Sequence, residues 1–427
     1  MKHIVLFGAG KSATVLINFL KELATKRNWQ VTIIDGDEDL LQSKIGNHQL
    51  VKGKSIDIFN EEEKNSIIQR ADIVISLMPP HLHLIIAKAC LSFNKNLLTA
   101  SYIDDETKKL ANEVKEKGLL FLYEMGLDPG IDHMSAMQII HKIKSKGGKI
   151  TSFKSHCGGL IAIESIDNPW FYKLSWNPRN IVNAGKSGAI YLENNVEKKL
   201  NYEELFNENN LIHVPNGEEY CYYANRDSLS YIPIYELENV NTFIRSTLRF
   251  PPFIKGWKKI VSLKLTDEKK VYDTNNLTLS EFFKQHISYH KLNTIVDEQL
   301  EYFGWNDNES LINKGMCTAA DILQFIMESK LSLHPNDKDM IVMLHEFDYE
   351  MDNKKHQLKS YLKVLGENNA ITAMAKTVGL PLGIAAELIL DGKITTTGLK
   401  IPTIPEIYEP VLKELQQHNI KFEEFTT

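Results

Sequence analysis

The sequence contains few cysteines, little excess charge of either sign and no long uninterrupted apolar run. Its 427 residues include four cysteines, which form no CxxC pair and no metal-ligand spacing. We therefore predict no metal site, and we expect reduced thiols and a cytoplasmic location. The longest uncharged segment, 73–87, is broken by prolines and histidines and falls short of the roughly 18 apolar residues that cross a bilayer. No membrane span is expected.

The balance of charge excludes several kinds of partner. With 49 Lys and Arg against 55 Asp and Glu, the net charge is −6. General binding to nucleic acid or to anionic membranes needs a basic excess, so we expect neither partner. A local basic pocket for an anionic small molecule is still compatible with this charge. The chain opens directly with the apolar run 4–7, which is typical of a strand rather than a signal peptide.

The N-terminal region, to about residue 125, alternates between short apolar strands and helical segments. Strands are expected at 4–7, 31–34, 72–77, 96–100 and 118–122, with helical patterns in the intervals. Continuous apolar strands bounded by helices are typical of a parallel sheet buried on both faces. This pattern predicts an α/β fold with a doubly wound Rossmann sheet.

The pattern changes after residue 150. Strands are expected at 150–156 and 241–250, separated by long polar or aromatic stretches. The alternating segment 340–350, a turn at Asp352-Asn353 and the segment 357–365 indicate an antiparallel hairpin. Helical periodicity over 280–329 indicates a small helical unit inserted into this second region.

A glycine-rich segment follows the first expected strand. Residues 8–13 read Gly-Ala-Gly-Lys-Ser-Ala, which fits G-x-G-x-x-G/A between a strand and a helix. Gly8 permits a tight turn, Gly10 lets the backbone approach a pyrophosphate, and the helix N-terminus presents free N–H groups to phosphates. We interpret the segment as a dinucleotide site; an ordinary βα turn is the alternative.

Asp35 closes the second expected strand and bears on the choice of cofactor. A carboxylate at this point accepts hydrogen bonds from a ribose 2′-hydroxyl and repels a 2′-phosphate. The next five residues contain no Arg or Lys. This favours NAD over NADP, the alternative being that Asp35 faces solvent.

Polar residues at later strand ends are candidates for the chemistry. Asp128 follows the strand at 118–122, and Ser101-Tyr102 follows the strand at 96–100. Carboxyl ends of parallel strands face the ligand crevice, so these side chains are placed to meet substrate and nicotinamide. The Asp-Pro-Gly sequence at 128–130 is equally explained as a simple turn.

Further candidates lie in the second region. Cys157 precedes a Gly pair, which suggests a close approach of backbone to ligand, although a tight bend is the simpler explanation. Arg226, Arg245 and Arg249 have the chemistry of bidentate carboxylate clamps, with surface ion pairing as the alternative. The histidines at 81, 83, 133 and 141 do not form a metal set.

Several segments spread over nearly the whole chain carry a resemblance to one family. They are Ser101-Tyr102, Glu-Met-Gly-Leu-Asp-Pro-Gly-Ile-Asp-His at 124–133, Cys-Gly-Gly-Leu at 157–160, Asn168-Pro169 with Tyr172-Lys173, Asn-Arg-Asp-Ser at 225–228 and Arg-Ser-Thr-Leu-Arg at 245–249. Together these segments closely resemble saccharopine dehydrogenase of the L-glutamate-forming type. The family's usual Cys-Gly-Gly-Leu-Pro-Ala-Pro-Glu has lost both prolines here, which predicts a more mobile loop around Ile161 and Ile163.

The resemblance implies three parts. A Rossmann domain spans 1–130 and is completed by about 370–427. A mixed α/β domain at 131–275 and 336–369 binds substrate and mediates homodimer formation. A small helical domain is inserted at 276–335.

The resemblance also implies a set of site residues. The expected catalytic residues are Tyr102, Asp128 and Cys157. The expected cofactor-binding residues are Gly8, Ala9, Gly10, Lys11, Ser12, Asp35, Gly36, Asp57, Ser76, Leu77, Met78, Ala100, Ser101, Leu127, Asp128, Pro129 and Ser175. The expected substrate-binding residues are Ser101, Tyr102, Asp128, Lys173, Ser175, Trp176, Arg226, Arg245 and Thr247.

The implied activity is NAD(P)-dependent interconversion of saccharopine with L-glutamate and 2-aminoadipate 6-semialdehyde through an imine, in lysine metabolism. An oxidoreductase with the same imine chemistry on another amine, such as carboxynorspermidine synthase, is one alternative. A protein that senses NAD without turnover is another. The site serves either direction of the reaction, and an NAD preference favours oxidation.

Overall fold

The computed structural model describes residues 1–426, which form two compact units. Unit 1 comprises Met1–Gly147 and Ala370–Phe422, and unit 2 comprises Gly148–Asn369 and the segment from Glu423 onward. The first boundary lies after Gly147 rather than at residue 130, because α7 (Ile131–Ser145) packs on α15 (Pro405–Gln417) of the same unit. The last strand, β19 (Glu423–Thr426), joins unit 2 because it pairs with a strand there.

A parallel seven-stranded sheet forms the centre of unit 1, with the order β18-β6-β5-β4-β1-β2-β3. Its strands are β1 (His3–Phe7), β2 (Gln30–Asp35), β3 (Val51–Ser55), β4 (Ile73–Ser76), β5 (Asn96–Thr99), β6 (Leu120–Leu122) and β18 (Gly398–Lys400). The predicted doubly wound fold and its five predicted strands are confirmed. The sequence pattern missed β3, because four of its five residues are exposed and only Val51 is buried. It also missed β18, which has only three residues.

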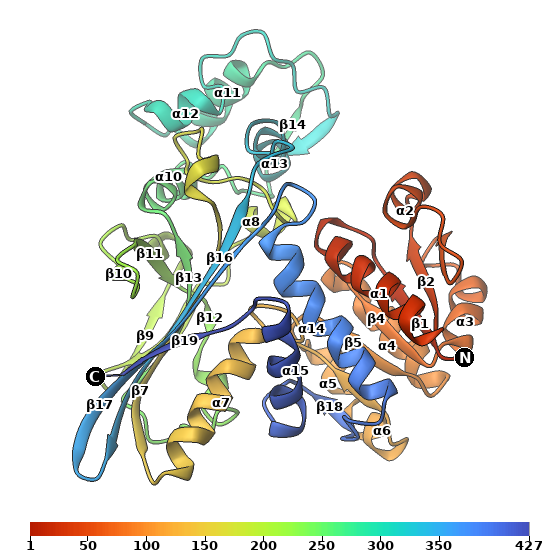
Figure 1. The fold of residues 1–427 in the computed structure, drawn as a ribbon. Helices are drawn as coiled ribbons and strands as arrows, with labels where there is room; N and C mark the ends of the chain where they lie inside the picture. The colour runs from red at the N-terminus through yellow and green to blue at the C-terminus, as the bar shows by residue number, and fades with distance from the viewer. Residues whose placement is uncertain (427) are drawn as a thin grey trace. The chain divides into compact units, whose positions relative to one another are not determined.

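Helices cover both faces of this sheet (Figure 1). They are the short turn η1 (Lys11–Ala13), α1 (Thr14–Arg27), α2 (Glu38–Ile45), α3 (Glu61–Arg70), η2 (Pro80–Leu82), α4 (His83–Ser92), α5 (Asp105–Lys108), α6 (Ala111–Glu116), α7, α14 (Ala373–Leu390) and α15. Several begin where a side chain accepts a backbone N–H of the first turn, as Asp37 does for α2 and Asn60 for α3.

The helix α14 is long and apolar enough to cross a membrane by length and composition, which corrects the expectation that no segment reaches that limit. Most of it, 72%, is buried inside the molecule. A Cβ added at Gly379 would lie 2.9 Å from the Leu16 backbone nitrogen, and one at Gly383 would lie 2.5 Å from the Phe19 ring. The small residues thus let α14 pack directly on α1, as a core helix does.

Unit 2 is built on a mixed ten-stranded sheet whose main path is β10-β11-β13-β7-β16-β17-β19. The path consists of β7 (Lys149–Ile161), β10 (Leu211–His213), β11 (Glu219–Ala224), β13 (Thr242–Arg249), β16 (Asp339–Met351), β17 (Lys354–Leu365) and β19, and the strands off the path are β8 (Ala189–Glu193), β9 (Val196–Leu200) and β12 (Arg226–Asp227). The predicted hairpin is confirmed as β16 and β17, which run side by side with β7 (Figure 1).

The helices of unit 2 gather around one aromatic core. They are η3 (Ile163–Ser165), α8 (Pro178–Val182), α9 (Tyr202–Leu205), η4 (Leu229–Tyr231), α10 (Pro251–Ser262), α11 (Leu279–His290), α12 (Glu298–Tyr302) and α13 (Ala319–Lys330), with the small ribbon β14 (Val271–Asp273) and β15 (Met316–Thr318). Phe282 and Leu323 of the expected insertion share a single buried cluster with Trp170 and Trp257. The helical segment therefore packs as part of unit 2 and has no separate core.

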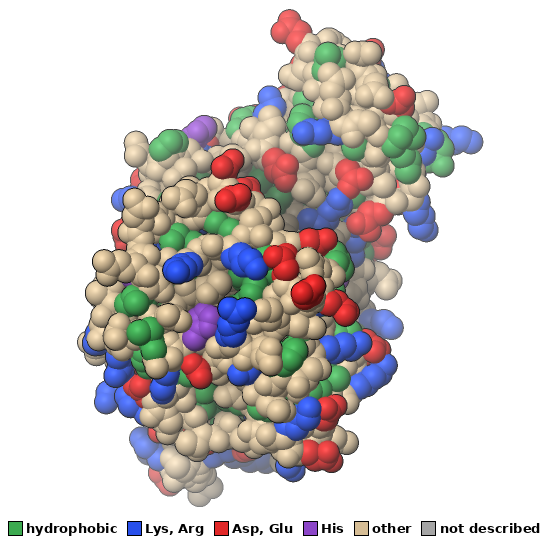
Figure 2. Space-filling model, turned by 90° about the vertical axis from the view of Figure 1, so that its right-hand side faces the viewer, with side chains coloured by type: hydrophobic (Ala, Val, Ile, Leu, Met, Phe, Trp, Pro, Cys, Tyr) green, Lys and Arg blue, Asp and Glu red, His purple; other side chains and the backbone are tan. Residues whose placement is uncertain are grey.

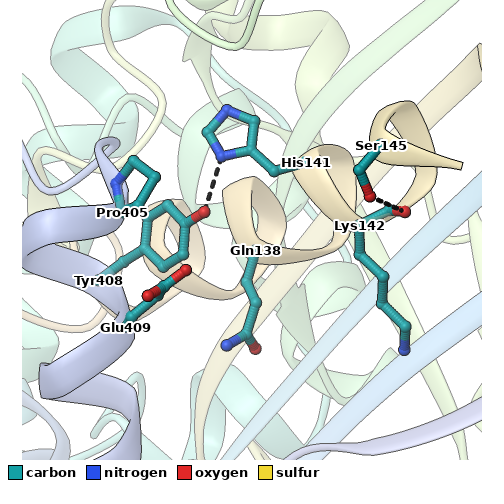
Figure 3. Close-up of a pocket in the computed structure, with 7 residues that line it drawn as sticks. All are labelled: Gln138, His141, Lys142, Ser145, Pro405, Tyr408 and Glu409. Carbon is teal, nitrogen blue, oxygen red and sulfur yellow. Dashed lines mark hydrogen bonds between the residues drawn. The ribbon is translucent and has the colours of Figure 1, made fainter.

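The surface carries mixed charges. On the face shown in Figure 2, Lys and Arg side chains are interspersed with Asp and Glu, and apolar side chains are scattered. A shallow hollow lies between α7 and α15, where His141 Nδ1 is 2.7 Å from the Tyr408 hydroxyl (Figure 3). None of the predicted site residues lines this hollow.

Candidate functional site

The glycine loop of unit 1 has the geometry that a pyrophosphate requires. Gly8 has φ +97°, and a Cβ there would lie 2.8 Å from the Leu77 carbonyl oxygen. Gly10, in contrast, is open, with nothing within 4 Å of an added Cβ. Lys11 and Ser12 begin η1, and their N–H groups head the helical segment that continues into α1. A closely packed first glycine and an open second glycine fit the dinucleotide-binding pattern predicted from the sequence.

Asp35 lies directly against this loop. Its Oδ2 accepts a hydrogen bond from the Ala9 N–H at 2.7 Å, and its Oδ1 accepts one from the Asp37 N–H at 3.2 Å. The carboxylate is therefore fixed at the end of β2, between the loop and Gly36. A carboxylate at this position can accept a hydrogen bond from the ribose 2′-hydroxyl of a bound dinucleotide.

Lys44 is a neighbour of this loop that sequence reasoning missed. Its Nζ donates to the Gly10 carbonyl oxygen at 2.5 Å. Burial lowers the pKa of Lys44 to about 8, and the nearby Asp35 charge opposes that shift. The five residues after Asp35 contain no Arg or Lys that would indicate a basic group here. Lys44 lies near the far end of α2, and its side chain reaches back to the loop.

The ends of β4, β5 and β6 bring further predicted residues together. The Leu77 N–H donates to the Phe7 carbonyl at 2.8 Å, so the segment carrying Ser76, Leu77 and Met78 borders the glycine loop. Ala100 packs against the next strand end, since a Cβ on Gly126 would lie 2.9 Å from the Ala100 Cβ. Asp57 lies two residues after β3 instead, where it caps a turn by accepting the Phe59 N–H at 2.9 Å.

Tyr102 and Asp128 meet at this edge of the sheet. The Tyr102 hydroxyl donates to Asp128 Oδ1 at 3.4 Å, and both side chains are half-buried. Leu127 and Pro129 flank Asp128 in a tight turn that closes at Gly130, whose φ of +146° only glycine adopts readily. The Asp-Pro-Gly sequence is thus a turn, and that turn also delivers Asp128 to Tyr102.

Buried charged residues hold the same turn in place. Glu124 Oε1 accepts the Ile103 N–H at 3.3 Å, and its Oε2 lies 2.8 Å from His133 Nε2. Asp132 Oδ1 accepts the Gly130 N–H at 2.6 Å. The segments carrying Tyr102 and Asp128 are therefore fastened to each other through Glu124 and His133, which the sequence analysis had not assigned to the site.

In unit 2 a second group of predicted residues shares one face of the sheet. Cys157 on β7 pairs with Thr247 on β13. Arg245, Thr247 and Arg249 alternate along β13, so their side chains point to the same face. The Cys-Gly-Gly sequence is thus part of a straight strand and is neither a bend nor a loop. Gly158 is required there because a Cβ would lie 2.7 Å from the Leu248 Cβ.

The segment that lacks the two family prolines lies at the end of β7. Ile161 is the last residue of β7 and pairs with Asp339, while Ile163 begins the turn η3. The Ala162 N–H also donates to the Lys338 carbonyl at 2.9 Å. Backbone hydrogen bonds therefore hold this segment, and the greater mobility expected from the loss of the prolines stays a prediction.

Arg249 is a buried cation on this face. It is buried, and its guanidinium donates only to the backbone carbonyls of Leu248 at 2.8 Å and Gly159 at 3.5 Å. Within the described part of the chain its Nε has no hydrogen-bond partner. The guanidinium carbon lies 5.4 Å from the Tyr172 ring centroid. The Phe253 ring centroid lies at the same distance. A buried cation that in the described residues meets carbonyls and aromatic rings is suited to receive a carboxylate.

The remaining predicted substrate residues lie in different surroundings. Trp176 Nε1 donates to the Tyr172 hydroxyl at 3.1 Å, and Ser175 beside it is buried. Arg245 is buried and its guanidinium lies 4.3 Å from the Tyr231 ring centroid. Arg226 is exposed on β12, with φ +50°.

Lys173 already has two anionic partners. Its buried Nζ lies 2.6 Å from Asp167 Oδ2 and 2.6 Å from Asp337 Oδ2. Asp167, Asp337 and His334 also lie close enough together to resemble a metal-ligand set. The Lys173 ammonium group sits between the two carboxylates, so we read this cluster as an ion-pair network. We leave Lys173 out of the substrate clamp proposed below.

The fold and the unit 1 site define a class: a two-unit protein with a Rossmann dinucleotide-binding domain. Residues 4–122 match the family described as the saccharopine dehydrogenase NADP binding domain, and residues 126–420 match the saccharopine dehydrogenase C-terminal domain. The chain belongs to the saccharopine dehydrogenase family, which confirms the resemblance seen in its sequence.

Relatives with curated names agree with this assignment. A Saccharomyces cerevisiae protein named saccharopine dehydrogenase [NADP(+), L-glutamate-forming] is 30% identical, with 97% of each chain covered. The bovine mitochondrial alpha-aminoadipic semialdehyde synthase is 33% identical over 99% of this chain and 47% of its own length. The chain thus spans about half the length of that relative. The apo structure of the yeast L-Glu-forming saccharopine dehydrogenase superposes with a TM-score of 0.87 at 29% identity and covers both chains completely.

Proposed function

We propose that this chain catalyses the NAD(P)-dependent oxidation of saccharopine to L-glutamate and 2-aminoadipate 6-semialdehyde, and the reverse reaction. The observation that carries the proposal is the Tyr102–Asp128 pair after β5 and β6, at the same carboxyl edge of the parallel sheet as the glycine loop. It supplies a proton-transferring pair where the nicotinamide end of a dinucleotide is expected. The names of the relatives support the substrate.

The reaction balances as a two-electron oxidation followed by hydrolysis. Hydride leaves the lysine-side carbon of the secondary amine, and the nitrogen loses its proton, which gives an imine. Water adds to the imine carbon, and the C–N bond of the resulting carbinolamine breaks to release glutamate and the aldehyde. The nicotinamide ring, when bound, accepts the hydride.

The residues of unit 1 handle the protons. Asp128, hydrogen-bonded to Tyr102, is placed to take a proton from the amine, and Tyr102 is placed to pass a proton to or from the water that attacks. A positioned acid or base contributes about 10²–10⁴-fold. The family resemblance adds Cys157, which is buried in unit 2, as a third candidate for this work.

The residues of unit 2 hold the substrate. Saccharopine carries three carboxylates, and Arg245 and Arg249 present two buried guanidinium groups on one face of the sheet. Thr247, between them, adds a hydroxyl group on the same face. Arg226 is the remaining predicted clamp, supplied from β12. Buried arginines that donate to carboxylates bind with geometric specificity as well as charge.

We propose further that NAD is preferred over NADP, although the yeast relatives are named for NADP. Asp35 is fixed against the glycine loop by the Ala9 N–H, and three more acidic residues follow it at 37–39. This concentration of negative charge repels a 2′-phosphate. Lys11 within the loop and Lys44 beside Gly10 are the positive charges that oppose this repulsion.

A single assay tests the activity and the cofactor together. Purified protein is mixed with saccharopine and either NAD or NADP, and reduction of the nicotinamide is followed by absorbance. We expect turnover with both cofactors and a lower KM for NAD. Turnover of another amine but not of saccharopine would favour a related imine reductase. Cofactor binding without any turnover would favour the NAD-sensor alternative.

Variants at the reacting groups connect the activity to the site. Tyr102→Phe and Asp128→Asn should each lower kcat by about 10²–10⁴-fold with the fold intact. Phe59→Leu, at an exposed position near the same sheet edge, is the matched control. Full activity in both site variants would contradict the assignment.

We also propose a homodimer and a cytoplasmic location. The homodimer follows from the family resemblance, and light scattering coupled to size-exclusion chromatography tests it. The four cysteines are free thiols buried in the structure, which suits a reducing compartment. Fractionation of cells that express the tagged protein tests the location.

A further inference from the structure

His83 connects the ends of two strands beneath the proposed site. It is the first residue of α4 and its side chain is almost completely buried. Its Nδ1 lies 2.8 Å from the Ser76 hydroxyl, and its Nε2 lies 2.6 Å from the Ser101 hydroxyl. The imidazole therefore joins β4 to the residue that follows β5. Neither the sequence motifs nor the proposed mechanism uses this histidine.

The imidazole is neutral at physiological pH. Burial lowers the pKa of His83 to about 4, against the opposing attraction of Asp104. A neutral imidazole carries one N–H, so one ring nitrogen donates and the other accepts. The two serines must therefore play opposite roles.

The surroundings of Nδ1 decide which nitrogen donates. Thr99 Oγ1 accepts the Ser101 N–H at 3.2 Å and lies 3.5 Å from Nδ1, so its own proton is available to that nitrogen. The Ser76 hydroxyl is fully buried, and Nδ1 is its one partner among the described residues. A buried O–H without an acceptor costs roughly 1–3 kcal/mol. Two hydroxyl donors thus face Nδ1, which makes it the acceptor.

The Ser101 hydroxyl oxygen therefore accepts a hydrogen bond from His83, and this fixes the direction of its own proton. With Nδ1 as the acceptor, Nε2 carries the proton and donates to Ser101 Oγ. The proton of Ser101 must then point away from His83. Ser101 is half-buried at the sheet edge, two residues from the strand that carries Thr99, so this proton is available to a bound molecule.

We propose that His83 is a positioning residue that makes Ser101 a hydrogen-bond donor to an acceptor oxygen of bound saccharopine. The proposal rests on the proposed function and assigns a defined role to one residue of that site. His83 acts only through Ser101. Because α4 and two strands fix the imidazole, the hydroxyl is oriented before the substrate arrives, which removes part of the ordering cost of binding.

Four variants test this dependence: His83→Asn, Ser101→Ala, the double variant, and His81→Asn. The asparagine has no second nitrogen to reach Ser101. His81 is an exposed histidine two residues away and serves as the matched control. We expect kcat/KM for saccharopine to fall about 10- to 100-fold in each site variant, as for a misplaced positioning group. The double variant should be no worse than Ser101→Ala, and the control should match wild type.

Two outcomes would overturn the proposal: effects of the two site variants that multiply in the double variant, or an unchanged kcat/KM in His83→Asn. A histidine nitrogen NMR spectrum of the unliganded protein gives a separate readout that needs no turnover. We expect a neutral ring protonated at Nε2 at pH 7, whose resonances shift in Ser101→Ala. A ring protonated at Nδ1 would contradict the proposal even if His83→Asn failed to fold. Absence of saccharopine turnover in wild type would refute the proposed function, and this spectrum would still decide the role of His83.

Discussion

Replacing Arg249 by methionine should weaken substrate binding without weakening the fold. The guanidinium is buried, and it is held by two backbone carbonyls and by no carboxylate in the described residues. In the free protein an apolar side chain of similar volume is neutral or stabilising at such a site, by up to about 4 kcal/mol. In the complex, the substrate carboxylate loses its partner, which costs about 2–5 kcal/mol.

The variant is therefore expected to bind saccharopine more weakly while its free energy of unfolding stays the same or rises. At 1.36 kcal/mol for each factor of ten, the loss of binding corresponds to about 30- to 5,000-fold in the Kd for saccharopine. Titration calorimetry measures this Kd, and urea unfolding measures stability. Arg70→Met removes an exposed arginine that donates to Ser66 and is the matched control. An unchanged Kd, or a large loss of stability in Arg249→Met, would show that Arg249 serves the fold instead.

The other predictions concern the cofactor, the glycine loop and two ion-pair clusters. Asp35→Ser should reduce the preference for NAD over NADP, measured by fluorescence titration, and an unchanged ratio would contradict the charge argument. Gly8→Ala should abolish cofactor binding, because its φ of +97° and the Leu77 carbonyl at 2.8 Å exclude a Cβ, whereas Gly10→Ala has room. Lys173→Met should lower the free energy of unfolding in urea by about 1–3 kcal/mol, since Asp167 and Asp337 lose a charged hydrogen-bond donor while Asp167 stays open to water, and Lys338→Met should change it by about 0–1 kcal/mol. Burial raises the pKa of Glu346, but His156 and Lys359 outweigh burial and lower this pKa to about 2. The ionised Glu346 should therefore stabilise the folded protein fully above the pKa of the unfolded state. This contribution to the free energy of unfolding should fade as the pH falls from about 4.5 toward 2. Unfolding of Glu346→Gln at several pH values checks this, and a difference from wild type that persists undiminished at low pH would contradict it.

The sequence was sufficient where a pattern is local. The strands of unit 1 and the hairpin of unit 2 were recognised because apolar runs and alternation reflect burial directly. The strand β3 was missed because its side chains are mostly exposed at a sheet edge. The apolar length of α14 was overlooked because Gly379, Pro381 and Gly383 interrupt its sequence, whereas close packing against α1 keeps it a single helix.

The sequence by itself determined the Rossmann fold, the glycine loop and the family, since each depends on neighbouring residues in a fixed order. Only the tertiary structure decided what the charged and polar side chains do. Lys173 meets Asp337 across 164 positions of sequence, and His83 reaches Ser101 across 18. Such partners are chosen by the folding of distant segments onto each other, and electrostatic and hydrogen-bond energies depend on that final distance and burial.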